Sequence, residues 1–252
     1  MKKDKKTKAI FCIHGFITDY TDFDKLSPLF KKKYDSAYFF NVPGHYPADF
    51  KLFDSDKTFE LLLSEFDNLQ KKYDSVDVAG FSMGGALGSY LACVRKVHKL
   101  ILLSPANKYL NTGYSFRWTA FYLKRVFENF TNSNFDLTKA VSLSKNELSK
   151  YVTDNKEAVN MMVTKLLPNY NAHTLVTFAK TIKKCNEGLK KNYTPCLILY
   201  GELDELVPLS SVEYLKEYFL NAKVIIYDDV GHLMIKGSKA EKLADDIELF
   251  IS

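Results

Sequence analysis

Short apolar runs recur along the chain, and each ends at turn-forming or polar residues. Most of their positions are apolar without alternation, and six runs are recognised: Ala9–Ile13, Ala37–Val42, Val76–Ala79, Leu100–Leu103, Cys196–Tyr200 and Val224–Tyr227. Most are separated by stretches with helical periodicity, such as Phe59–Tyr73, whose apolar side chains repeat at three- and four-residue steps. Strands that are continuously apolar and alternate with helices are typical of a parallel sheet buried on both faces. The pattern therefore predicts an α/β fold with about six mostly parallel strands flanked by helices.

This rhythm breaks once, between Ala106 and Tyr193, where the pattern is helical throughout and no strand is predicted. A segment of that length is too long to be a plain connection. We expect a helical cap, residues 106–193, inserted after the strand that ends near Leu103. The 252 residues otherwise fit a single domain, residues 1–252, with one large core.

The strongest chemical signal is Gly80-Phe81-Ser82-Met83-Gly84, which follows one predicted strand and precedes the helical run Ala86–Val94. This G-x-S-x-G spacing is that of a nucleophile elbow, where a strand turns so sharply into a helix that the flanking positions cannot carry side chains. Ser82 is therefore the predicted nucleophile. The alternative is a small-residue turn whose serine only caps the helix.

A serine hydroxyl needs a general base to become a nucleophile, and that base needs an orienting acid. His232 lies in the loop after the last predicted strand, from which it can reach back to the strand ends. We predict that it is the base, with His14 and His45 in other strand-end loops as its rivals.

The acid is predicted from the loop after the Cys196–Tyr200 strand. Asp204 is the choice there, and its neighbours Glu202 and Glu205 are interpreted as surface charges. The chain order serine, aspartate, histidine is the one found on α/β-hydrolase sheets and differs from the orders of the two serine protease families.

At these residues the chain resembles the α/β-hydrolase superfamily, in its carboxylesterase, monoacylglycerol lipase and serine aminopeptidase-like branch. The motifs that carry the resemblance are His14-Gly15-Phe16, Pro43-Gly44-His45, Gly80–Gly85, Gly201-x-x-Asp204 with Val207-Pro208, and Gly231-His232. The resemblance implies an oxyanion hole made by the backbone N–H groups of Phe16 and Met83. It also implies that His14 forms a turn and is not the base. The chain lacks the His-Gly-Gly-Gly run of some lipases, so their substrate range is not carried over.

The resemblance implies a serine hydrolase that cleaves small carboxylic esters, of the carboxylesterase or monoacylglycerol lipase type, through an acyl-enzyme. Apolar residues of the predicted cap are candidates for an acyl pocket or for the cap's own packing: Tyr114, Phe116, Trp118, Phe121, Met161, Met162 and Leu166. One alternative is an aminopeptidase of the proline-iminopeptidase type, with Glu128, Asp136 or Glu147 holding the substrate amine. The other is a non-catalytic protein of the same fold that binds a small ligand.

Composition narrows the partners and the location. The net charge is +5, and part of the excess is in the lysines of the first eight residues. We interpret those lysines as a solvated terminus, with weak attraction to an anionic membrane surface as the alternative. No nucleic-acid-binding motif follows them, and no apolar run is long enough to insert stably in a membrane. Four scattered cysteines, without a C-x-x-C pair, are typical of reduced thiols, so we expect a cytoplasmic protein with no metal or organic cofactor.

Overall fold

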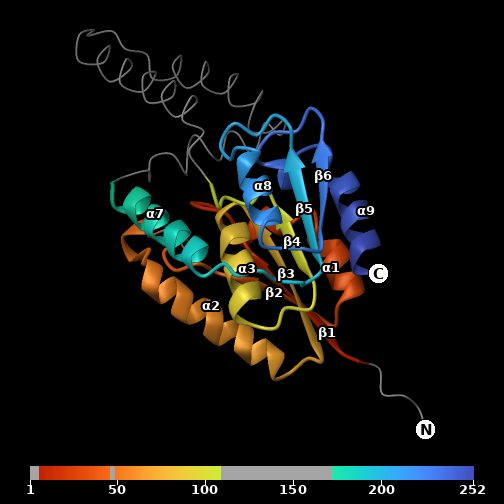
Figure 1. Ribbon diagram of the computed structural model, residues 1–252. Helices are drawn as coiled ribbons and strands as arrows, with labels where there is room; N and C mark the ends of the chain where they lie inside the picture. The colour runs from red at the N-terminus through yellow and green to blue at the C-terminus, as the bar shows by residue number, and fades with distance from the viewer. Residues whose placement is uncertain (1–5, 46–48, 109–171) are drawn as a thin grey trace.

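A six-stranded parallel sheet forms the centre of the protein (Figure 1). The computed structural model describes residues 6–45, 49–108 and 172–252. Its strands are β1 (Lys8–Ile13), β2 (Ser36–Phe40), β3 (Ser75–Phe81), β4 (Leu100–Leu103), β5 (Cys196–Gly201) and β6 (Ala222–Tyr227). They lie in the order β2-β1-β3-β4-β5-β6, and every neighbouring pair is parallel. The predicted parallel sheet is confirmed, and each of the six apolar runs forms one of its strands.

Helices cover both faces of this sheet, as predicted. The described α-helices are α1 (Ser27–Lys33), α2 (Ser55–Gln70), α3 (Met83–Val94), α7 (Ala172–Glu187), α8 (Ser210–Lys216) and α9 (Ala240–Ile251). Short 3₁₀ turns are η1 (Tyr20–Phe23), η2 (Phe50–Leu52) and η5 (Met234–Lys236). Apolar side chains of α2, α3, α7 and α8 join the core on one face of the sheet, and those of α1 and α9 join the core on the other.

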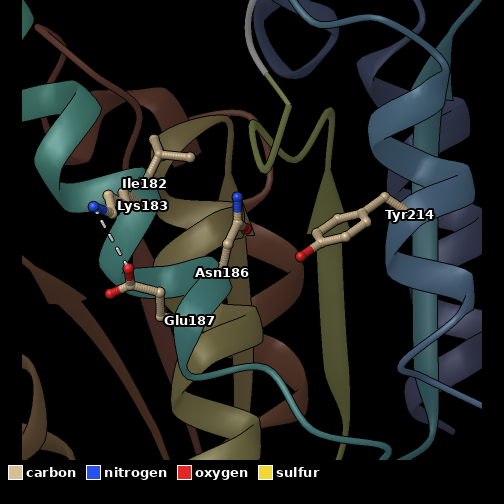
Figure 2. A pocket seen from close by; sticks show the side chains of 5 residues that line it. All are labelled: Ile182, Lys183, Asn186, Glu187 and Tyr214. Atoms are coloured by element: carbon tan, nitrogen blue, oxygen red, sulfur yellow. Dashed lines mark ion pairs between the residues drawn. The ribbon is translucent and has the colours of Figure 1, made fainter.

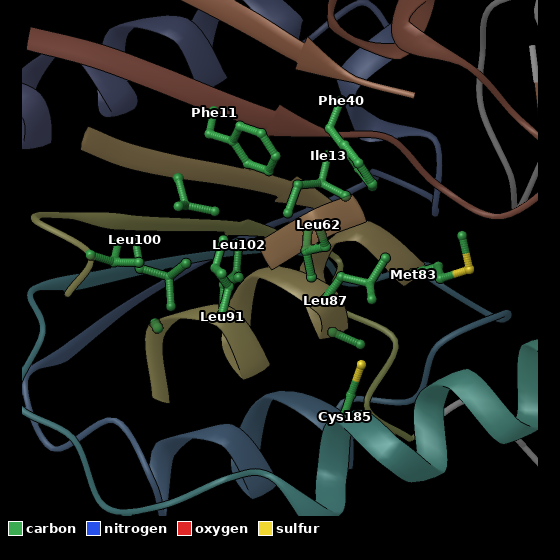
Figure 3. Close-up of a cluster of buried hydrophobic side chains, with 14 of the residues drawn as sticks. Phe11, Ile13, Phe40, Leu62, Met83, Leu87, Leu91, Leu100, Leu102 and Cys185 are labelled. Carbon is green, nitrogen blue, oxygen red and sulfur yellow. The ribbon is translucent and has the colours of Figure 1, made fainter. Parts of the chain in front are cut away.

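The strands divide their side chains between these two cores. On β4, Leu100 and Leu102 pack under α3, whereas Ile101 and Leu103 face α1 and α9. Figure 3 shows the first core, where Leu87 and Leu91 of α3 lie against the strand side chains. The central strands β1, β3, β4 and β5 are buried on both faces and are therefore apolar at nearly every position, which explains the continuous runs in the sequence.

Only the two ends of the predicted cap can be compared with the structure, because residues 109–171 lie outside the described ones. Its last part includes α7, which packs on α2 and α3. Lys180 and Lys184 of α7 both bind Asp56 at the start of α2, with Nζ to carboxylate distances of 2.8 and 2.9 Å. These two lysines lower the pKa of Asp56 to about 2. Helix α7 thus belongs to the layer that covers the sheet, and the cap remains a prediction for residues 109–171.

Two expectations from composition concern the described residues as well. The four cysteines all lie among them and are free thiols, with Cys12, Cys185 and Cys196 buried. None of the helices within the described ranges is both long enough and apolar enough to cross a membrane.

Candidate active site

Ser82 occupies a strained turn between β3 and α3. Its φ and ψ are 53° and −116°, a conformation that costs a residue with a side chain of the order of 1–3 kcal/mol. The turn is so tight that a Cβ at Gly80 would lie 2.2 Å from the carbonyl oxygen of Gly84, and one at Gly84 would lie 2.0 Å from that of Ile13. The glycines of the G-x-S-x-G motif are therefore needed for space, and the serine is held at the carboxyl end of a central strand.

The three predicted triad residues meet at this edge of the sheet. The Ser82 hydroxyl donates to Nε2 of His232 over 2.9 Å, and Nδ1–H of His232 donates to Oδ2 of Asp204 over 2.7 Å. All three residues are more than nine-tenths buried. This chain of hydrogen bonds leaves Nε2 as the acceptor that faces the hydroxyl, which is the tautomer that a general base requires.

The loop after β5 fixes the orientation of Asp204. Its second oxygen, Oδ1, accepts hydrogen bonds from the backbone N–H groups of Leu206 (3.0 Å) and Val207 (2.9 Å). The Tyr200 hydroxyl donates to the Val207 carbonyl over 2.9 Å and so braces the same loop. Of the three acidic residues of this loop, Asp204 is the one that is hydrogen-bonded to His232.

The two rival histidines have other partners. His14 donates from Nδ1 to the Gly15 carbonyl over 2.8 Å, and its Nε2 accepts from the Val42 N–H over 3.1 Å. His45 donates from Nδ1 to the Pro43 carbonyl over 3.1 Å. Burial lowers the pKa of His14, and burial with the nearby His14 lowers the pKa of His45 to about 3. Both rings are therefore neutral, buried and bonded to the backbone of the loops that follow β1 and β2.

Phe16 and Met83, whose N–H groups the resemblance assigns to an oxyanion hole, follow the ends of the neighbouring strands β1 and β3. Met83 is the first residue of α3, where the helix dipole favours negative charge. Phe16 follows Gly15, and its ring stacks on Phe178 of α7 at a centroid distance of 4.6 Å. Because His14 binds the Gly15 carbonyl, it fixes the peptide plane that also contains the Phe16 N–H.

The substrate pocket predicted from the sequence falls outside the described residues, since Trp118, Phe121, Met161 and Met162 all belong to 109–171. The same holds for Glu128, Asp136 and Glu147. Among the described residues there is an open hollow of about 410 Å³ between α7 and α8. Figure 2 shows Tyr214 of α8 pointing toward Asn186 of α7 across it. None of the three predicted triad residues lines this hollow, so it is separate from the hydrogen-bonded chain of Ser82, His232 and Asp204.

The sequence matches the family model described as alpha/beta hydrolase fold over residues 8–237. The chain therefore belongs to the alpha/beta hydrolase fold family, as the motifs predicted.

Two curated relatives extend this likeness over most of the chain. Each is named "Putative esterase/lipase 2". The protein of Mycoplasma pneumoniae is 28% identical over 249 residues, covering 92% of this chain and 84% of its own length. The Mycoplasma genitalium protein is 29% identical over 246 residues, covering 91% and 84%.

Solved structures share the fold at lower identity. An esterase from Exiguobacterium antarcticum superposes with a TM-score of 0.69 at 18% identity, covering 98% of this chain and 93% of its own. The monoacylglycerol lipase of Paleococcus ferrophilus has a TM-score of 0.66 at 16% identity, covering 96% and 93%.

Proposed function

We propose that this protein is a serine hydrolase that cleaves carboxylic esters, with Ser82 as nucleophile, His232 as general base and Asp204 as orienting acid. The observation that carries the proposal is the continuous hydrogen-bonded chain from the Ser82 hydroxyl through His232 to Asp204, built on a strained elbow. The names of the two Mycoplasma relatives support an ester substrate over an amide.

The reaction follows from this geometry. His232 Nε2 takes the proton of the Ser82 hydroxyl while Oγ attacks the ester carbonyl carbon. The carbonyl oxygen becomes an oxyanion, for which the backbone N–H groups of Phe16 and Met83 are the proposed donors. When the tetrahedral intermediate collapses, the C–O bond breaks and His232 gives its proton to the departing alcohol.

The second half repeats these steps with water. His232 deprotonates a water molecule, which attacks the acyl-enzyme carbonyl, and the proton then returns to Ser82 as the carboxylic acid leaves. Asp204 stabilises the charged imidazole in both halves, and its two backbone hydrogen bonds keep its oxygens in place. We propose a small ester or a monoacylglycerol-type lipid as substrate, since one neighbouring structure is a monoacylglycerol lipase.

Fluorophosphonate labelling with mass mapping tests the proposal. We expect one adduct, on Ser82, and none in Ser82→Ala. Ser104→Ala is the matched control, because Ser104 also follows a strand and also has a positive φ (43°), but its hydroxyl contacts Met234 and not His232. It should label as the wild type does. Label on another residue, or its persistence in Ser82→Ala, overturns the assignment.

Turnover of p-nitrophenyl esters of graded acyl length, beside aminoacyl p-nitroanilides, then tests the substrate class. We expect hydrolysis of the esters to depend on Ser82 and to exceed that of the anilides. Preferential cleavage of the anilides would favour the aminopeptidase alternative, and labelling without turnover of either class would contradict an ester hydrolase.

A further inference from the structure

A buried carboxylate outside the triad contacts the turn that carries the proposed oxyanion donor Phe16. Asp22, in η1, is completely buried, although its sequence context, between Asp19 and Asp24, is that of a solvated acidic segment. Its Oδ2 accepts hydrogen bonds from the Gly15 N–H over 3.0 Å and from the Thr18 hydroxyl. One oxygen atom therefore holds both ends of the turn Gly15–Thr18, which contains Phe16 and is called the oxyanion turn below.

The other oxygen of Asp22 connects this turn to the loop of the general base. Oδ1 lies 3.4 Å from Nζ of Lys236, in η5, which follows His232 by four residues. The Lys236 side chain is only 13% exposed, and its Nζ also donates to the Thr21 hydroxyl over 3.3 Å. The carboxylate thus bridges two segments that are distant in sequence and meet at the site.

The bridge acts on the peptide groups on both sides of Gly15. Asp22 binds the Gly15 N–H, and His14 binds the Gly15 carbonyl. The planar trans peptide from Gly15 to Phe16 directs its N–H opposite to its carbonyl, so fixing Gly15 also fixes the direction of the Phe16 N–H. An oxyanion donor lowers the barrier only if it is already aimed when charge develops, and a misplacement of about 1 Å can cost about 100-fold in rate.

A charge, and not merely an acceptor, is what this position needs to hold Lys236. A buried carboxylate is unfavourable unless it is paired, and a buried ammonium group likewise. Each group therefore keeps the other in place, and the turn cannot shift relative to η5 without separating the two charges.

We propose that Asp22 and Lys236 are positioning residues that hold the oxyanion turn in register with the His232 loop. Neither touches the substrate or the reacting atoms. The inference rests on the proposed function. Because the pair of Asp22 and Lys236 contributes to stabilising the transition state, loss of the pair should lower kcat and leave KM at the wild-type value.

The test compares four variants with the wild type. Asp22→Asn keeps an oxygen for Gly15 and Thr18 but removes the charge, and Lys236→Met removes the partner charge while keeping an unbranched, mostly apolar side chain. Lys236→Arg restores the charge. Lys25→Met is the control, because Lys25, shortly after η1, donates from Nζ to the carbonyl of Gly237, directly after η5, over 2.8 Å and so joins the same two segments without a recognised bond to the turn Gly15–Thr18.

Two readouts separate positioning from folding. The first is kcat and KM on a p-nitrophenyl ester, normalised to the fraction of Ser82 that reacts with fluorophosphonate. The second is the inhibition constant of a trifluoromethyl ketone. Its tetrahedral adduct with Ser82 carries a negatively charged oxygen and so mimics the transition state of ester hydrolysis. We expect kcat to fall by about 10- to 100-fold in Asp22→Asn and Lys236→Met. The inhibition constant should rise by the same factor, while Lys236→Arg recovers most of the loss and Lys25→Met resembles the wild type.

The possible failures are distinguishable. A wild-type protein that forms no Ser82 adduct overturns the proposed function and this inference with it. A reactive wild type whose Asp22→Asn and Lys236→Met variants keep normal kcat overturns the inference alone. Loss of activity without a parallel loss of ketone binding, or an equal loss in Lys25→Met, shows a structural role and also overturns it. If Asp22→Asn does not fold, Thr18→Val and Lys236→Met decide by the same readouts.

Discussion

Asp204 and His232 are joined by a 2.7 Å hydrogen bond while the second oxygen of Asp204 is held by two backbone N–H groups. Because each oxygen has its own partners, the Asp204 carboxylate is held in a single orientation. In Asp204→Asn the amide oxygen must accept from Leu206 and Val207, so the amide NH₂ faces Nδ1 of His232. The imidazole is then forced to carry its proton on Nε2, where it cannot accept the proton of Ser82.

We therefore expect Asp204→Asn to lower kcat on p-nitrophenyl esters by about 10⁴-fold with little change in fold or KM. Glu205→Gln is the control, since Glu205 lies in the same loop without bonding His232. Steady-state kinetics and circular dichroism measure both. Retention of more than about a tenth of the activity in Asp204→Asn would mean that the acid lies elsewhere.

The glycines of α3 differ in how close they come to the sheet. A Cβ at Gly84 would meet the carbonyl oxygens of Ile13 and His14 at 2.0 and 2.5 Å, and backbone cannot move aside there without parting β1 from α3. At Gly88 the nearest atom is a Val78 methyl at 3.2 Å, which can give slightly. We expect Gly84→Ala to lose more than about 4 kcal/mol of unfolding free energy or not to fold.

Gly88→Ala is the matched substitution in the same helix. The gain of about 1 kcal/mol in helix propensity offsets the crowding, so the variant should lie within about 1 kcal/mol of the wild type. Urea denaturation followed by circular dichroism distinguishes the two. Equal effects at the two positions would contradict the close approach of α3 to β1.

His45 predicts a dependence of stability on pH. The pKa of His45 is about 3 in the folded chain, compared with 6.5 for an exposed histidine of the unfolded chain. Between these two pH values the unfolded chain binds a proton that the folded chain does not. The free energy of unfolding is therefore unaffected by His45 above pH 6.5 and decreases as the pH falls from 6.5 toward 3, because the unfolded chain gains a proton that the folded chain does not bind. Between pH 7 and pH 5 the loss amounts to about 2 kcal/mol.

His45→Gln removes this titration. We expect its unfolding free energy, measured by urea denaturation at pH 7, 6 and 5, to fall by about 2 kcal/mol less than that of the wild type over the same interval. Parallel curves for the two proteins would show that the ring is not held neutral.

A second buried carboxylate lies near the start of β3, away from Ser82. Asp77 accepts from the Tyr34 hydroxyl over 2.6 Å, and its other oxygen is 2.7 Å from Nδ1 of His98. Burial and the nearby Asp77 raise the pKa of Tyr34, so the phenol stays a donor. Tyr34→Phe leaves a buried oxygen without its partner and should lower the unfolding free energy by about 1–3 kcal/mol.

Ester hydrolysis should be unchanged in Tyr34→Phe at temperatures where it is folded. Tyr38→Phe is the control, because its hydroxyl binds Glu65 at the surface, and it should change stability by less than about 0.5 kcal/mol. Thermal unfolding beside an ester assay tests both, and a comparable loss from the two variants would contradict the argument from burial.

Features marked by a local pattern or a recognised motif were predictable, including the meeting of Ser82, Asp204 and His232, whereas pairings of residues outside such motifs were not. The central strands were recognisable because burial on both faces makes them apolar at nearly every position, and Ser82 because close approach requires glycine at both flanking positions. Strand ends were less exact: β3 continues to Phe81, beyond the predicted Ala79, because it pairs with β1 as far as Gly80 and with β4 as far as Phe81.

The buried carboxylates show what the sequence hides. Asp22 lies among acidic residues and looks solvated, while its partner Lys236 is near the other end of the chain. Asp77 is a charged residue within an otherwise mostly apolar strand, and only the structure shows that Tyr34 and His98 bind its carboxylate. A carboxylate is stabilised by whichever donors the fold brings near it, and no local pattern encodes that proximity.

The strand order also determines the order in which parts of the site can form during synthesis of the chain. Strands β1 to β4 pair among themselves and leave the ribosome first, whereas β5 joins β4 only after the longest connection in the chain has been made. Closing so long a loop delays pairing more than it weakens it. Ser82 follows one of the early strands, whereas Asp204 and His232 follow the late ones, so a nascent chain holds the proposed nucleophile without its proposed base until β5 and β6 have been added.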